Sequence, residues 1–230
     1  MIIIVPFIFF NLIFTSDMMY EYIENTKVPI FVKLFFGKSI FIEDIFYYVG
    51  MIMKEMMEGQ NIREEEVAEL LKDRLDLYID NEDEWEKLME NEISMLLKSS
   101  FSNFILESIG WTYENVSNIF LEEKANSGIN KKDIYLKEAN ERMIRNSIVL
   151  RQSIDNLYYE HILNLLEEEK NEILEEILRN ILKIILCDVE TTVRRSAQKV
   201  LQNAEGDTNL MFKRAKGLQS LGKMILQKVN

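Results

Sequence analysis

Few side chains of this chain could carry out a reaction or hold a metal ion. Its 230 residues include one histidine, His161, and one cysteine, Cys187. Catalytic schemes and metal sites that need two histidines are excluded, among them a di-iron site built from paired Glu-x-x-His motifs. A single cysteine also excludes an intramolecular disulfide bond and a cysteine-rich zinc site. Gly37-Lys38-Ser39 matches only the end of a phosphate-binding loop, because the upstream glycine and the preceding strand are missing.

The two reactive side chains have ordinary helical neighbours. His161 lies near Tyr158 and Ile162, which is typical of a histidine on the surface or partly buried side of a helix. Cys187 follows an apolar run and is expected to be an inert buried thiol. Carboxylate runs such as 167–169 are expected to be solvated helix faces. We therefore expect no enzyme activity, no cofactor and no metal ion; an enzyme of unrecognised type is the remaining alternative.

The composition predicts an all-α protein with a single multi-helix domain. Only 8 glycines and 2 prolines interrupt the chain, which argues against a β-sandwich or barrel. Hydrophobic residues make up 47% and charged residues 29%, the balance of a globular protein. Apolar residues recur at steps of three and four, as in amphipathic helices. We expect helices over 61–78, 85–96 and 99–121, a long central helical region over 132–187, and two closing helices over 189–204 and 210–229.

The first apolar run, Ile2 to Phe14, allows three interpretations. It is too short to span a membrane, which takes roughly 20 apolar residues. A signal peptide is disfavoured because no Lys or Arg precedes the run and no small-residue cleavage site follows it. A buried first helix is favoured, with a membrane-peripheral anchor as the alternative. A membrane partner is therefore not expected.

An aromatic segment follows and offers a candidate protein-binding surface. Most of its side chains are expected in the core, and those that reach the surface would bind a partner. The candidate residues are Phe31, Phe35, Phe36, Phe41, Phe46, Tyr47 and Tyr48.

The C-terminal part is basic within a chain whose formal net charge is −12. Basic patches can bind nucleic acid. The basic residues from Arg194 onward are spread over two expected helices, and no aromatic platform for stacked bases lies among them. We expect a solvated face that packs against the acidic remainder of the chain, and no nucleic-acid partner.

Three groups of segments together resemble the X domain of DnaJ-type (J-domain) co-chaperones. The three groups occur in the family's order. The first is the paired phenylalanines with the later Y-I pair, the second is S-F with I-G-x-x-Y, and the third is V-L-x-D with R-A-x-x-L-x-x-L-G. They are Phe9-Phe10 with Tyr22-Ile23, Ser100-Phe101 with Ile109-Gly110-Trp111-Thr112-Tyr113, and Ile185-Leu186-Cys187-Asp188 with Arg214-Ala215-Lys216-Gly217-Leu218-Gln219-Ser220-Leu221-Gly222. The resemblance covers residues 9–226 best, within a single domain over 1–230. Departures at Thr15, Glu24 and Ser102, where the family has glycine, indicate a divergent member.

The resemblance implies a non-catalytic helical interaction module of a co-chaperone. Such a module binds a client or partner protein, or pairs two copies, while a J domain elsewhere recruits Hsp70. The J-domain motif His-Pro-Asp is absent, since His161 is followed by Ile162, so Hsp70 would be an indirect partner only. The low cysteine content favours the cytoplasm. The Asn-, Lys- and Ile-rich character is similar to J-proteins of malaria parasites, which would also admit export from the parent cell.

Overall fold

Six helices and no strand make up the residues that the structure, a computed structural model, describes: 22, 59–98, 102–125, 130–164, 170–202 and 207–229. Side chains at 130, 157–164, 170–178, 181, 182 and 185 lie outside this description. The helices are α5 (Gln60–Asp80), α6 (Glu82–Leu96), α7 (Ser102–Ala125), α8 (Asn130–Asn164), α9 (Lys170–Gln202) and α10 (Thr208–Val229). The predicted fold class, a single all-α domain, is confirmed.

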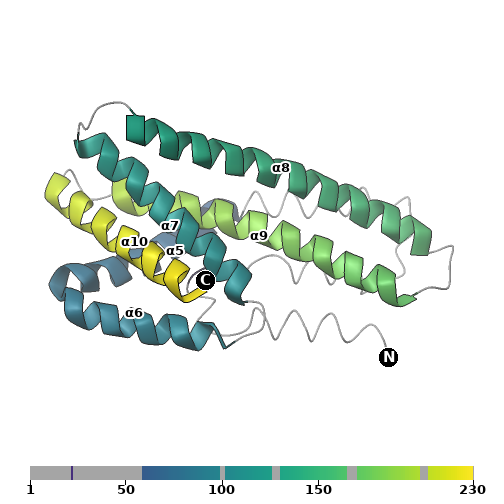
Figure 1. Ribbon diagram of the computed structural model, residues 1–230, viewed down its shortest axis with the longest axis horizontal. Coiled ribbons are helices and arrows are strands. Elements are labelled where there is room, and N and C mark those ends of the chain that lie inside the picture. The colour runs from purple at the N-terminus through teal and green to yellow at the C-terminus, as the bar shows by residue number, and fades with distance from the viewer. Residues whose placement is uncertain are drawn as a thin grey trace.

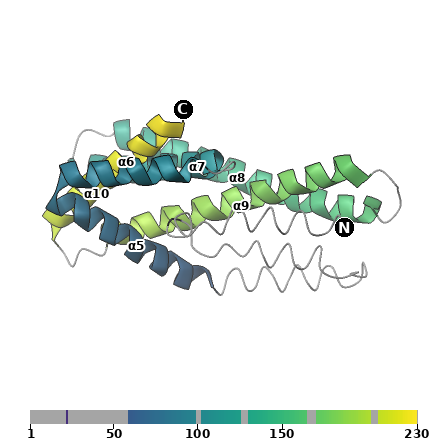
Figure 2. The same cartoon turned by 90° about the horizontal axis from the view of Figure 1, so that it is seen from below.

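Two crossed helix pairs form the core of the molecule. The α7–α10 pair packs on the pair formed by α5 and α9, and α6 closes the side next to α5 and α10 (Figures 1 and 2). Helix α8 lies along α9, and both extend beyond the other helices (Figure 1). Helices α5, α6, α7, α9 and α10 contribute buried apolar side chains to one cluster, and α8 packs against it through the partly buried Leu150 and Ile154. The fully buried members of the cluster include Leu75, Trp85, Ile93, Ile105, Ile109, Val193, Leu218 and Leu221.

Two helices begin where a polar side chain caps them. Asn81 Oδ1 accepts a hydrogen bond from Glu84 N at 3.3 Å, and three acidic residues occupy the first turn of α6. Asp207 Oδ1 accepts hydrogen bonds from Asn209 N and Leu210 N at the start of α10. Both caps satisfy backbone donors that have no partner within the helix. The helix breaks expected near these two residues are therefore present.

One helix boundary differs from the sequence expectation. Residues 189–202 do not form a separate closing helix, because they continue α9, which begins at Lys170. The helix continues through Thr191 and Thr192. Their side-chain hydroxyls donate hydrogen bonds to the backbone carbonyls one turn earlier, those of Cys187 and Asp188. An amphipathic pattern can change its buried face along one long helix when different neighbours cover its two halves.

Several described residues of the quoted family segments lie where helices touch each other, whereas Phe9-Phe10, Ile23 and Ser100-Phe101 lie outside the described residues. Gly110 on α7 and Gly222 on α10 bring the two backbones together, so that a Cβ atom built on Gly222 would lie 2.8 Å from the Gly110 oxygen. Arg214 on α10 forms a two-pronged ion pair with Asp76 on α5, with contacts of 2.9 and 3.3 Å to its two oxygens. Tyr22 is buried, with the Arg74 guanidinium 4.3 Å from its ring centre. Gly110, Gly222, Arg214 and Tyr22 therefore take part in packing between helices or in the core.

Candidate functional site

Glu190 joins three helices through one carboxylate. It lies on α9 and is 3% exposed. Its Oε2 accepts hydrogen bonds from Arg142 Nε on α8 at 2.7 Å and from Ser108 Oγ on α7 at 3.1 Å. Arg142 also contacts Glu107 on α7 at 3.4 Å. Because a buried carboxylate is costly unless it is paired and hydrogen-bonded, these contacts hold α7, α8 and α9 in one arrangement.

Two arginines approach the ring of Trp111 beside this carboxylate. The Arg142 guanidinium lies 4.1 Å from the ring centre and that of Arg194 lies 5.4 Å away, within the range of cation–π interactions. Arg194 Nη1 also donates a hydrogen bond to Asn115 Oδ1 at 3.1 Å. Burial and the nearby Arg142 charge lower the pKa of the Arg194 guanidinium, and Glu190 opposes this shift. The I-G-x-x-Y segment thus places its tryptophan against a charged cluster.

A second group of charges joins α5 to α9. Arg63 donates to both oxygens of Asp188, at 2.8 and 2.6 Å, in a two-pronged ion pair. Glu64 accepts a hydrogen bond from Arg195 at 3.0 Å. Burial alone would raise the pKa of Glu64, but hydrogen bonds from Gln60 and Arg195 lower it, so the carboxylate is favoured. This ion-pair network fixes the start of α5 on the middle of α9.

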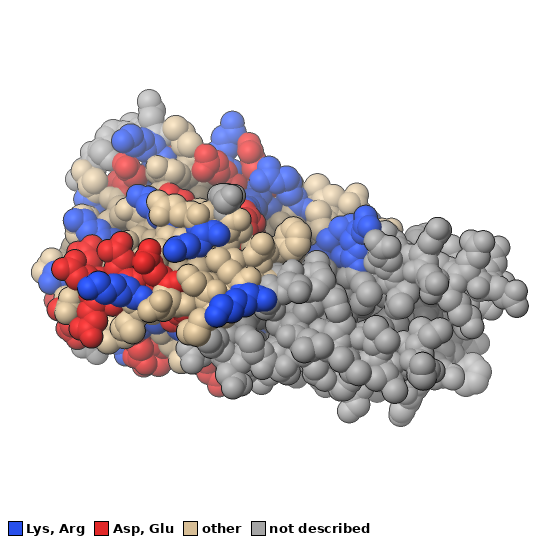
Figure 3. Space-filling view, turned by 60° about the horizontal axis from the view of Figure 1, so that its bottom comes forward, with Lys and Arg blue, Asp and Glu red and all other residues tan. Residues whose placement is uncertain are grey.

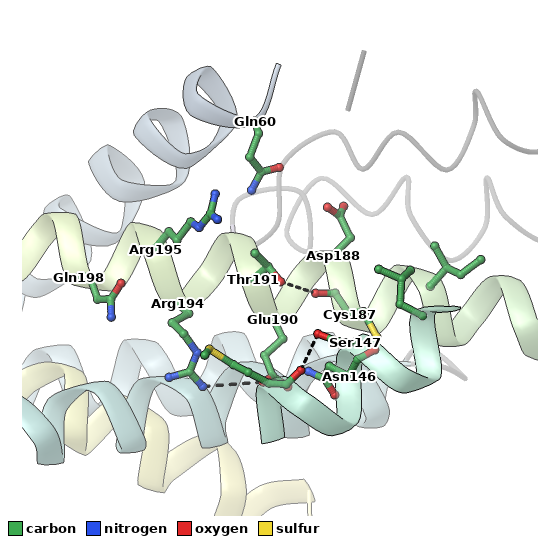
Figure 4. A pocket seen from close by; sticks show the side chains of 13 residues that line it. Gln60, Asn146, Ser147, Cys187, Asp188, Glu190, Thr191, Arg194, Arg195 and Gln198 are labelled. Carbon is green, nitrogen blue, oxygen red and sulfur yellow. Dashed lines mark hydrogen bonds and ion pairs between the residues drawn. The ribbon is translucent and has the colours of Figure 1, made fainter. Parts of the chain in front are cut away.

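A cavity of about 550 Å³ lies among α5, α8 and α9, between the two charged groups (Figure 4). Its apolar lining comes from Met143 and Leu150 on α8 and from Ile184 and Cys187 on α9. Polar and charged side chains from the three helices complete the lining: Gln60, Asn146, Ser147, Asp188, Glu190, Thr191, Arg194, Arg195 and Gln198. Figure 4 shows Arg194 and Glu190 pointing toward each other on the α8 side of the cavity. Its volume is in the range of small-ligand pockets.

The thiol of Cys187 is expected to react slowly within this cavity. Burial raises its pKa to about 11, and the charges of Glu190 and Asp188 add to this effect. Because the thiolate is the nucleophile, we expect alkylation by iodoacetamide at neutral pH to be about 100-fold slower than for an ordinary thiol. The rate should rise with pH until about pH 11. Mass spectrometry at several pH values measures the alkylation rate. Urea-unfolded protein is the control, and its rate should follow pH as that of an ordinary thiol does. The same pH dependence in the folded protein would contradict the burial of Cys187.

The candidate residues from the sequence fall in different places. Two groups of candidate residues lie outside the described residues. They are residues 37–39 and the seven aromatic residues Phe31, Phe35, Phe36, Phe41, Phe46, Tyr47 and Tyr48. His161 belongs to α8, but its side chain lies outside the description. Cys187 is buried, as expected. No group of three metal-ligating side chains occurs within the described part of the chain.

The sequence analysis missed Arg142, Glu190 and Trp111 as members of one cluster. A usable signal was the placement of Glu190 in a helix segment with apolar residues on both sides, at Val189 and Val193. A charge at such a position is buried and needs a partner. The identity of that partner could not be found, because Arg142 lies 48 residues away.

The basic C-terminal part is partly solvated and partly buried. Arg194 and Arg214 are buried, so the expectation of an exposed face is wrong for these two residues. The expected packing against acidic residues is confirmed, since Arg195 contacts Glu64, Arg214 contacts Asp76 and Lys228 contacts Glu90. On the face shown in Figure 3, basic and acidic side chains are interspersed over the described residues.

The helical fold and the positions of the quoted segments define the class of protein. The family model for the X domain of DnaJ-containing proteins matches residues 60–230, and the chain belongs to this family. Within the described residues, no helix is both long enough and apolar enough to cross a membrane.

Three relatives come from Plasmodium falciparum. An uncharacterized J domain-containing protein of isolate 3D7 is 36% identical, over all of this chain and 56% of its own length. The ring-infected erythrocyte surface antigen is 26% identical over 94% of this chain in isolates NF7 (Ghana) and FC27 (Papua New Guinea), covering 32% and 22% of those proteins. The chain thus spans about half of the first relative and a third or less of the others. No solved structure matches the chain.

Proposed function

We propose that this chain is the non-catalytic, protein-binding part of a J-domain co-chaperone, and that a J domain elsewhere in the native product recruits Hsp70. Family membership and the J domain-containing relative support the co-chaperone context. The observation that carries the binding role is an apolar strip on α8, formed by Ile144 and Ile148 one turn apart, which are 60% and 51% exposed. Ile134, which is 53% exposed, lies further along the same helix beyond the exposed Lys137–Glu141 ion pair. The strip lies on a long helix that already packs against α9 with another face.

The domain and the binding surface that we propose include residues that the structure does not describe. We propose one domain over 1–230 and retain the seven aromatic residues as a second part of the binding surface. Pairing of two copies through the α8 strip is the alternative use of the same residues. For the compartment we propose the cytoplasm of the parent cell, with export included because one relative's name refers to the surface of the infected erythrocyte.

Replacing two isoleucines of the strip tests the proposal. The full chain should slow the aggregation of a chemically denatured reporter protein, measured by light scattering. The variant Ile144→Gln with Ile148→Gln should need a roughly 30-fold higher concentration for the same effect, because burying each half-exposed isoleucine against a client contributes roughly 1 kcal/mol, about 2 kcal/mol for the two. Glutamine has at least the helix propensity of isoleucine, so Tm should not fall.

The matched control removes the same kind of apolar surface elsewhere. Leu77 and Leu88 are about half exposed on α5 and α6, and Leu77→Gln with Leu88→Gln should keep the activity. Equal losses in both variants would mean that capture is general adhesion, and no effect of the full chain on aggregation would contradict the proposed function. Multi-angle light scattering of the same samples reports whether the strip instead pairs two copies.

A further inference from the structure

An apolar groove of about 450 Å³ lies between α5 and α6. The two helices are joined at Asn81 and lie side by side, and α6 lies at the edge of the molecule (Figure 1). Leu77, Leu88 and Met95 line the groove and are 49%, 48% and 47% exposed. Large apolar side chains that are half exposed on both walls of one groove are typical of a docking site.

The apolar side chains of each wall repeat at the spacing of a helix face. Leu70 and Leu77 are seven residues apart on α5, as are Leu88 and Met95 on α6, which is two turns or about 10 Å. Both walls are helices whose backbone groups bond within the helix, so an extended peptide would find no backbone partners there. A helix satisfies its own backbone and presents apolar side chains over the same two turns. The groove therefore suits an amphipathic helix.

The groove also carries negative charge that no nearby cation balances. Arg74, the basic residue of its lining, is paired with Glu92 at 2.9 Å. Asp73 of the lining forms no ion pair or hydrogen bond within the described part of the chain, and neither do the exposed Glu66 and Asp80. At steps of four and three, these three acids alternate with the leucines of the α5 wall. Free carboxylates therefore follow the apolar side chains along one face of α5.

The lysines of α5 and α6 do not cancel this charge. Lys72 is paired with Glu69 at 3.0 Å, and Lys87 is not part of the groove lining. Free carboxylates attract cationic side chains, and they repel the phosphates of nucleic acids and anionic lipids as well as a helix rich in carboxylates. Charge complementarity therefore selects a basic helix from a polypeptide.

We propose that the α5–α6 groove binds a basic amphipathic helix of a partner polypeptide. The apolar face of that helix lies against Leu77, Leu88 and Met95, and its lysines or arginines lie beside Asp73 and Asp80. This site is on other helices than the α8 strip and goes beyond the client capture proposed above. The groove selects one helical segment by its charge and spacing.

Titration with a designed peptide tests the proposal. The probe is a capped peptide of leucine, lysine and alanine, about 18 residues long, whose leucines recur at steps of three and four so that one helix face is apolar. Methionine methyl groups of the full chain are labelled with carbon-13, and the Met95 signal is assigned with a Met95→Leu sample. The probe should shift the Met95 signal, and the absence of a shift would overturn the proposal.

Two altered peptides separate the contributions of helix face and charge. One has the same composition with its leucines scattered around the helix, and the other has glutamate in place of every lysine. Each should bind at least about tenfold more weakly than the probe. Equal binding of the scattered peptide would mean that no apolar face is recognised. Equal binding of the glutamate peptide would mean that charge does not select the partner, and either result would overturn the proposal.

A charge variant of the groove shows where the selection comes from. Asp73→Asn with Asp80→Asn should bind the probe about fivefold more weakly at low salt, and this difference should shrink at high salt because exposed charges are screened. Glu86→Gln with Glu138→Gln removes two exposed charges outside the groove, and it should bind the probe as the unchanged chain does. Equal losses in the two variants would show that only the net charge of the chain matters, which contradicts the proposal.

An apolar variant separates this inference from the proposed function. Leu77→Gln with Leu88→Gln should weaken probe binding by about tenfold or more while client capture is kept. Multi-angle light scattering without peptide reports self-association, and a dimer that this variant abolishes would make a second copy the occupant and overturn the proposal. Loss of capture by the full chain with probe binding intact counts against the proposed function alone. Capture without probe binding counts against this inference alone.

Discussion

Replacing Gly222 with alanine is expected to destabilise the protein by about 2–3 kcal/mol, although glycine-to-alanine changes inside helices usually stabilise by up to about 1 kcal/mol. The new Cβ would lie 2.7 Å from Glu114 N and 2.8 Å from Gly110 O, both backbone atoms of α7. Backbone atoms cannot rotate away as a side chain can, so α7 and α10 must move apart. The apolar contacts around Leu221 and Ile225 would loosen with them.

Thermal unfolding followed by circular dichroism measures this effect. We expect Tm to fall by roughly 5–10 °C for a chain of this size. Lys223→Ala, at the next and exposed position of α10, should change the free energy of unfolding by less than about 0.5 kcal/mol. An unchanged or raised Tm for Gly222→Ala would show that the two helices do not approach as closely as described.

Replacing Asp188 with asparagine is expected to cost about 3 kcal/mol, because it leaves a buried guanidinium without its counter-charge. Arg63 is 5% exposed and holds both oxygens of Asp188. Asparagine keeps the shape of aspartate, but one oxygen becomes an NH₂ group that faces another donor. Removing one partner of a buried pair costs more than the intact pair contributes, since the remaining charge stays desolvated.

Urea unfolding of the matched pair of variants measures the difference. Asp155→Asn breaks an exposed ion pair with Arg151 whose charged atoms lie 4.0 Å apart, and its cost should stay below about 0.5 kcal/mol. The loss for Asp188→Asn should also persist at high salt, because buried charges are little screened. Similar costs for the two variants would mean that the Arg63–Asp188 pair behaves like a surface contact.

Both expected losses of stability come from residues that belong to the quoted family segments. The glycine that ends R-A-x-x-L-x-x-L-G permits the α7–α10 contact, and its arginine, Arg214, pairs with Asp76. The aspartate that ends V-L-x-D is Asp188, which pairs with Arg63. In this chain, these residues of the family segments therefore hold helices together. The binding surfaces that we propose lie elsewhere, on the outer side of α8 and in the α5–α6 groove.

The sequence by itself determined the properties that depend on near neighbours. Three- and four-residue spacing of apolar side chains and the scarcity of glycine and proline indicate helices, because helix formation is governed by contacts within a few turns. The breaks at Asn81 and Asp207 were predictable for the same reason, since a capping side chain binds backbone groups two or three positions later.

Only the tertiary structure decided which charges are buried and where the cavity lies. Arg194 looked like part of a solvated basic face, yet it lies beside Trp111 and Glu190 because α7, α8 and α9 converge there. Arg63 and Asp188 are 125 residues apart in the chain. The packing of amphipathic helices against each other determines such ion-pair partners. The spacing of residues within one helix does not show which distant helix will cover its polar positions.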